Sequence, residues 1–156
     1  MIKHILYPTD GSEASQAALK DLQAIAQSFQ AKITLLHCYE FTMGHVLYRY
    51  GTDSAYVQEV EKRFENYGHE TLHALANELR DSGFQIEKEL VMKGSAGPLI
   101  LKTAHEEGCD LILMGTRGLG GFRSVFLGST SHYVANHSKD IPVYLVPVPE
   151  SGQTAN

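Results

Sequence analysis

A glycine-rich stretch at residues 110–131 has the residue types of an anion-binding loop. It opens with four apolar residues at 111–114, a run that is typical of a strand buried on both faces. It then passes through Gly115 and Gly118, and a helical pattern begins after Gly128 with the hydroxyl residues 129–131. Glycines let a backbone turn sharply and approach a ligand closely. A helix start offers unpaired N–H groups and the positive end of the helix dipole, so the stretch predicts a phosphate site.

The spacing of the glycines decides which phosphate motif is present. A Walker A loop needs a Lys directly before its Ser or Thr, and no Lys lies between Gly115 and Ser138. A dinucleotide fingerprint needs a third glycine at the position where Arg123 stands. What remains is the pattern Gly-x2-Gly-x9-Gly-Ser, which begins at Gly115.

Apolar periodicity elsewhere predicts strands and helices in alternation around this loop. Strands are expected at residues 2–7, 33–38, 84–91, 110–115 and 141–146, and helices at 12–29, 56–80, 98–107 and after 128. Such alternation predicts a parallel sheet with helices on both faces. A ligand would then sit beyond the carboxyl ends of the strands, where the strand order reverses.

Two segments have patterns of their own. Residues 84–91 alternate Phe84, Ile86 and Leu90 with polar side chains, which indicates an edge strand with one wet face. Residues 40–55 show no period and are expected to form a mobile connection near the site.

Composition excludes several function classes. The net charge is −5, and no basic run is present, so neither nucleic acid nor an anionic membrane surface is an expected partner. The cysteines Cys38 and Cys109 lie at the edges of apolar runs, where reduced thiols are expected, and this favours a cytoplasmic protein. No apolar run approaches the ~20 residues that a membrane span needs.

Several segments together resemble the universal stress protein family. The glycine pattern matches the nucleotide-binding motif of that family, G-x2-G-x9-G-[S/T], at every defined position. Residues 3–12, KHILYPTDGS, are similar to the opening strand and turn of the family, residues 35–38 to its second strand and residues 141–146 to its closing strand. The resemblance covers residues 1–148. It implies a five-stranded parallel α/β sheet of order 3-2-1-4-5, Rossmann-like and adenine nucleotide alpha hydrolase-like, in one domain at residues 1–150 followed by a disordered tail at 151–156.

The resemblance also implies an ATP site, with or without Mg²⁺, in a stress-response or regulatory protein. Asp10 would accept hydrogen bonds from the ribose hydroxyls. Pro8, Thr9, Cys38 and Met114 would line the adenine, with Cys38 standing where the family usually has Val. Backbone amides and hydroxyls would hold the phosphates, and Arg117 and Arg123 could add charge. The phosphate-binding residues would be Gly115, Gly118, Gly128, Ser129 and Thr130.

Three alternatives stay open. Asp10 lies between Pro8-Thr9 and Gly11-Ser12, a place that also suits a helix cap. The same site could serve a slow nucleotide hydrolase, although a nucleotide-binding protein with at most weak ATPase activity is favoured over a true enzyme. Residues 69–73 spell H-E-x-x-H, which suggests a zinc hydrolase at His69 and His73, but no third ligand is evident.

The last expected strand predicts a homodimer. Residues 141–146 are apolar and lie at a sheet edge in the order 3-2-1-4-5, and an uncovered apolar edge pairs readily with another chain. A two-fold axis through paired edges gives a closed assembly. The alternative is that Pro142, Pro147 and Pro149 protect the edge of a monomer.

Overall fold

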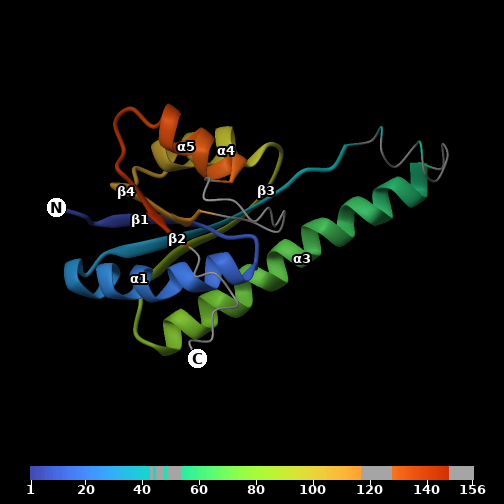
Figure 1. Cartoon of the computed structure of the whole chain (residues 1–156). Coiled ribbons are helices and arrows are strands. Elements are labelled where there is room, and N and C mark those ends of the chain that lie inside the picture. Colours follow the sequence, from blue (N-terminus) through green and yellow to red (C-terminus); the bar gives the residue numbers. More distant parts are fainter. Residues whose placement is uncertain (43, 45–47, 49–53, 117–127, 148–156) are drawn as a thin grey trace, which may run out of the picture.

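A computed structural model describes residues 1–42, 44, 48, 54–116 and 128–147. The elements are β1 (His4–Pro8), α1 (Glu13–Phe29), β2 (Lys32–Tyr39), α3 (Ser54–Asp81), β3 (Ile86–Lys93), α4 (Ala96–Glu106), β4 (Leu111–Gly115), α5 (Ser129–His137) and β5 (Val143–Val146) (Figure 1). The strands form one parallel sheet in the order β3-β2-β1-β4-β5, which confirms the predicted order.

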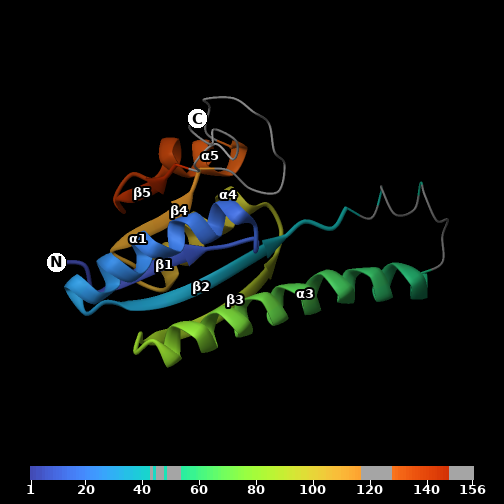
Figure 2. The same cartoon turned by 60° about the horizontal axis from the view of Figure 1, so that its bottom comes forward.

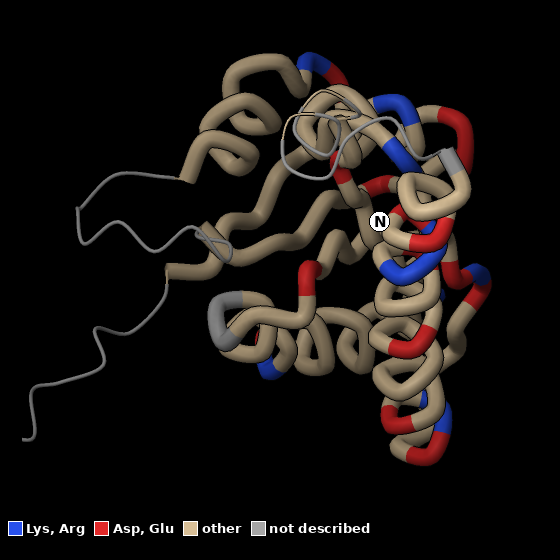
Figure 3. The backbone as a smooth tube through the Cα atoms, turned by 90° about the vertical axis from the view of Figure 1, so that its right-hand side faces the viewer, with Lys and Arg blue, Asp and Glu red and all other residues tan. Residues whose placement is uncertain are grey.

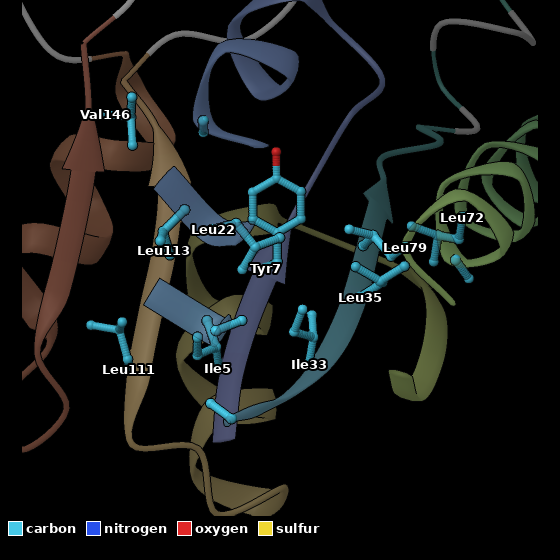
Figure 4. Packing of buried hydrophobic residues seen from close by; sticks show 14 residues of the cluster. Ile5, Tyr7, Leu22, Ile33, Leu35, Leu72, Leu79, Leu111, Leu113 and Val146 are labelled. Atoms are coloured by element: carbon cyan, nitrogen blue, oxygen red, sulfur yellow. The ribbon is translucent and has the colours of Figure 1, made fainter. Parts of the chain in front are cut away.

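The sheet is the middle of three layers. Helices α1 and α3 cover one face, and α4 and α5 cover the other (Figures 1 and 2). Alternate residues of each strand serve opposite cores. Ile5, Tyr7, Ile33 and Leu35 pack toward α1 and α3, as Figure 4 shows. Leu6, between Ile5 and Tyr7, and Leu36, directly after Leu35, belong to the core beneath α4 and α5. Strands buried on both faces therefore need the continuous apolar runs seen in the sequence.

Strand β3 differs from its predicted pattern. The register on β2 steps from Ile33–Ile86 to Thr34–Lys88, which leaves one extra residue on β3. A bulge of this kind reverses which side chains face which layer. Ile86 consequently packs with the α1/α3 core and Leu90 with the α4/α5 core, so the expectation that they share one face is wrong. The strand does lie at an edge, and it extends to Lys93, two residues beyond the expected end at residue 91.

Helix α3 extends well beyond the sheet (Figures 1 and 2). Its 28 residues span roughly 42 Å at 1.5 Å per residue, whereas the 8 residues of β2 span roughly 26 Å. The C-terminal half buries Leu72 and Leu79 completely, but Phe64 and Tyr67 are 45% and 49% exposed. The apolar stripe predicted along the helix is thus covered by the sheet for only part of its length.

Charged residues are dispersed over the molecule. Figure 3 shows basic and acidic positions interspersed. Several are joined in ion pairs at the surface, among them Lys32–Glu87 at 2.9 Å and Lys88–Glu107 at 2.7 Å. In the part of the chain that the structure describes, no helix combines the length and apolar character needed to cross a membrane. The expectations for the mobile connection fall largely on residues 43, 45–47 and 49–53, and those for the domain end and tail on 148–156; both lie outside the described residues.

Candidate functional site

The sheet opens at its switch point, between β1 and β4. The pairing of β1 with β4 includes Ile5–Leu111 and ends at Leu6–Ile112. On either side the ladders run further, to Pro8–Leu36 in β1–β2 and to Gly115–Val146 in β4–β5. The carboxyl ends of β1 and β4 therefore part from each other, which is where open α/β sheets bind ligands.

The turn after β1 carries Asp10 at this opening. The Thr9 amide donates to the Leu36 carbonyl oxygen at 2.9 Å, and Thr9 Oγ1 accepts from the Gly11 amide at 3.2 Å. Asp10 Oδ1 accepts from the Ser12 amide at 2.9 Å. Gly11 has φ +77°, a conformation that favours glycine. These bonds define one shape for the turn.

Ser12, and not Asp10, is the N-cap of α1. Its extended backbone precedes Glu13, and its side chain accepts from the Ser15 amide at 3.4 Å. The alternative in which Asp10 caps the helix is therefore wrong. Its carboxylate accepts from the Ser12 amide and so stabilises the turn that precedes the helix.

The Asp10 carboxylate affects the pKa of a buried tyrosine, Tyr7. The buried Tyr7 hydroxyl donates to the carbonyl oxygen of Ser15. Burial, and next the nearby Asp10 carboxylate, raise the pKa of Tyr7 well above its ordinary value. Tyr7 therefore stays neutral and anchors α1 below the turn.

The start of α5 faces the same edge of the sheet. The Gly128 amide donates to the Thr116 carbonyl oxygen at 2.6 Å, and Ser131 Oγ donates to the same oxygen at 2.9 Å. These bonds fasten the helix start to the end of β4. The first intrahelical bond runs from the His132 amide to Gly128, so the amides of residues 129–131 have no partner within the helix. The first turn contains no acidic residue, which leaves its positive end uncompensated and suited to an anion.

Cys38 and Met114 are apolar side chains near the ends of β2 and β4. Both belong to the core on the α4/α5 side of the sheet, and Met114 is buried. Pro8 follows Leu6 by two residues and so lies on the same side. Burial raises the pKa of the Cys38 thiol to about 12, so it is a neutral apolar group. Both cysteines of the chain are free.

The structure gathers most of the predicted site residues at one edge of the sheet. Pro8, Thr9 and Asp10 end β1 or follow it, Cys38 and Met114 lie near the ends of their strands, and Gly115 ends β4. Gly128, Ser129 and Thr130 begin α5. The Gly128 amide is already bonded, so this residue could hold phosphate only by letting it approach closely. Arg117, Gly118 and Arg123 lie outside the described residues.

Sequence reasoning missed the contribution of α3. Tyr67 and Thr71 would contact a side chain added at Gly11, and the ring of Tyr67 meets the ring of the buried His37. The available signal was Gly68, since a glycine inside a helix pattern often marks a close packing contact.

The H-E-x-x-H segment lies on the exposed surface of α3. His69 Nε2 is 3.7 Å from Glu65, and His73 Nδ1 is 3.4 Å from Glu89. Glu89 is also bonded to Arg80 at 2.8 Å. Among the described residues, no group of three or more His, Cys, Asp and Glu side chains is placed to hold a metal ion.

The parallel sheet, whose strand order reverses between β1 and β4, defines a Rossmann-like α/β protein. A family model described as the universal stress protein family matches residues 1–147. The chain therefore belongs to the universal stress protein family.

Relatives from two prokaryotes match nearly the whole chain. The chain is 31% identical over 159 residues to universal stress protein MJ0577 of Methanocaldococcus jannaschii, a match that covers 94% of this chain and 95% of that protein. It is 35% identical over 146 residues to a universal stress protein of Thermus aquaticus, with 94% and 99% covered.

Solved structures share the fold. The structure of MJ0577 superposes with a TM-score of 0.81 at 28% identity, covering 97% of this chain and 99% of that one. A universal stress protein in complex with cAMP has a TM-score of 0.63 at 23% identity, with 94% and 97% covered. A family protein from Arabidopsis thaliana with AMP bound has a TM-score of 0.67 at 17% identity, with 95% and 93% covered.

Proposed function

We propose that this protein binds ATP at the switch point and acts as a regulatory nucleotide-binding protein in a stress response. The observation that carries this proposal is the placement of two groups beside the ends of β1 and β4, where the pairing of these strands stops. One is the Asp10 carboxylate on its hydrogen-bonded turn, and the other is the start of α5, whose first amides have no partner within the helix. A nucleotide needs both: an acceptor for its ribose hydroxyls and donors for its phosphates.

The parts of the nucleotide have matching partners in this proposal. The carboxylate oxygen atoms of Asp10 accept hydrogen bonds from the ribose hydroxyls. The amides and hydroxyls of Ser129 and Thr130 receive the phosphates at the positive end of α5. Adenine lies against the apolar side chains of Cys38 and Met114. That two structural neighbours contain cAMP and AMP supports a nucleotide as ligand, and ATP is the finer proposal.

The proposal extends to the metal ion, the location and the type of activity. Mg²⁺, if it accompanies ATP, would be held chiefly by the phosphates. The two free thiols of the chain favour a cytoplasmic location. We favour binding over turnover as the function, because the groups that we assign to the site would position a nucleotide.

Calorimetric titration of wild type and Asp10→Ala with ATP and with 2′,3′-dideoxy-ATP tests the proposal. Wild type should prefer ATP, because the dideoxy compound lacks the hydroxyls that donate to Asp10. Asp10→Ala should lose roughly 1.5–3 kcal/mol of ATP binding free energy and most of this preference.

Two results would count against the proposal. Failure of wild type to bind ATP would remove it, and an unchanged preference in Asp10→Ala would remove the ribose role. Chromatography of the same samples after long incubation detects ADP or AMP, and steady product formation would favour the slow-hydrolase alternative.

A further inference from the structure

A buried histidine lies behind the turn that carries Asp10. His37, near the end of β2, is only 5% exposed, and its Nδ1 lies 3.0 Å from the carbonyl oxygen of Thr9. A carbonyl oxygen can only accept, so Nδ1 carries the hydrogen and donates. That carbonyl belongs to the peptide group joining Thr9 to Asp10. The His37 hydrogen bond therefore fixes the peptide plane directly before the candidate ribose-binding residue.

Helix α3 packs directly on His37. The ring of Tyr67 meets the His37 ring edge-on, with centroids 5.8 Å apart and planes inclined by 67°. A Cβ added at Gly68 would lie 2.7 Å from His37 Cδ2 and 2.8 Å from Val91 Cγ1. Such distances admit no side chain, so glycine at position 68 lets the helix backbone rest on the histidine.

The same part of α3 reaches the other side of the turn. A Cβ added at Gly11 would lie 3.0 Å from Tyr67 Oη and 3.2 Å from Thr71 Cγ2. The residue before Asp10, Thr9, is therefore bonded to His37, and the residue after it, Gly11, lies against α3. Tyr67 lies beside both His37 and Gly11.

We propose that His37 and Tyr67 are positioning residues for Asp10, and that they couple nucleotide binding to helix α3. This inference rests on the proposed function and adds regulation to the same site. A nucleotide that needs the bonded shape of the turn also favours the packed position of α3 on His37. By linkage, a ligand that binds more tightly when α3 is packed on His37 raises nucleotide affinity, and the nucleotide raises the affinity for that ligand by the same factor. A variant that displaces α3 at Tyr67 should lower nucleotide affinity.

A double-mutant cycle between His37 and Asp10 tests the proposal. His37→Leu removes the donor to Thr9 and should lower ATP affinity roughly three- to tenfold, with a matching fall in the preference for ATP over 2′,3′-dideoxy-ATP. In the Asp10→Ala background, His37→Leu should have little further effect, because the group it positions is absent. His37→Asn should restore part of the preference, since its side-chain amide can donate to the same carbonyl.

His4→Leu is the matched control. His4 is equally buried and also hydrogen-bonded, with Nε2 2.8 Å from Thr34 Oγ1, but it lies at the opposite end of β1. It should change stability without changing the preference between the two nucleotides. Tyr67→Ala truncates a half-exposed side chain and repeats the test from α3, including the case in which His37→Leu does not fold.

The outcomes separate this inference from the proposed function. Absence of ATP binding by wild type removes both. Normal binding by wild type, with an unchanged nucleotide preference in folded His37→Leu or in Tyr67→Ala, overturns the positioning role alone. Additive effects of His37→Leu and Asp10→Ala overturn it as well, because they would show that His37 acts independently of Asp10.

Discussion

At the scale of single residues, Gly11 connects the candidate ribose-binding turn with α3. Its φ of +77° disfavours any side chain, and an added Cβ would approach the Tyr67 hydroxyl. We expect Gly11→Ala to lower the free energy of unfolding by about 1–2 kcal/mol through its backbone conformation. It should also displace Tyr67, which is half exposed and can move outward, and so weaken ATP binding. Urea unfolding and calorimetry measure the two effects.

Gly108→Ala provides the matched control for this prediction. Gly108 has φ +64°, and an added Cβ there would meet nothing within 4 Å. It should cause a similar loss of stability with no loss of ATP affinity. Equal ATP affinities in the two variants would show that the contact between Gly11 and α3 has no bearing on the site.

The sequence predicts residues that follow a local rule and misses those that depend on packing. The sequence singles out Asp10 because it directly follows a predicted strand. It singles out Gly128 because this glycine belongs to the spaced motif and directly precedes a predicted helix. The roles proposed for His37 and Tyr67 rest on how α3 packs along β2, which no local pattern specifies. The backbone conformation of Gly128 could not be predicted from its residue type. Its φ of −58° suits any residue, so the backbone does not require glycine there.

At the scale of elements, His4 joins the start of β1 to β2. Its ring is buried and bonded to Thr34. Burial, followed by the charge of Lys32, lowers the pKa of His4 below its ordinary value of 6.5, against a smaller opposing effect of Glu107 and Glu87. The folded state consequently binds a proton less readily than the unfolded chain does.

This difference predicts a loss of stability in acid. As pH falls below 6.5, the unfolded chain takes up a proton at His4 before the folded protein does, so the free energy of unfolding decreases until the lowered folded pKa is passed. His4→Gln keeps a hydrogen-bonding group near Thr34 but does not titrate. Urea unfolding at about pH 7.5 and about pH 5.5 should show a smaller decrease in His4→Gln than in wild type. Equal decreases would show that His4 does not contribute to the acid sensitivity.

Elements were predicted more reliably in kind than in detail. The central strands β1 and β4 could be predicted from the sequence, because burial on both faces requires apolar runs. The bulge in β3 could not be predicted, because it arises from pairing with β2. It reverses the faces of a strand whose sequence alternates regularly. The exposed part of α3 was missed because an apolar stripe shows which face of a helix can be buried but not how far its partner extends.

At the scale of the whole molecule, β5 lies at one edge of the sheet, and no strand among the described residues pairs with its outer side. The carbonyl oxygens of Pro142 and Val146 accept at 3.0 Å from the amides of Ile112 in β4 and of Thr116 directly after it. The backbone groups of Val143 and Leu145 therefore point away from β4. We retain the homodimer through residues 141–146 as a prediction. Light scattering should give the mass of two chains for wild type and of one chain for Val143→Pro, which removes an outward donor where an edge strand tolerates proline.

Val143→Thr serves as the control for the dimer, because it keeps the amide and the branched side chain. It should remain a dimer, and both variants should bind ATP, since the site lies on the other side of β4. A wild-type mass of one chain would contradict the dimer and favour the alternative in which the prolines protect a monomer.

The central claim is that ATP occupies the gap between the ends of β1 and β4. An amide NMR titration of the wild-type protein with ATP tests this most directly, because it reports both binding and place. We expect saturable shifts concentrated at two separated segments, residues 9–12 and residues 129–131. The absence of saturable shifts, or shifts confined to the His69–His73 surface of α3, would contradict it.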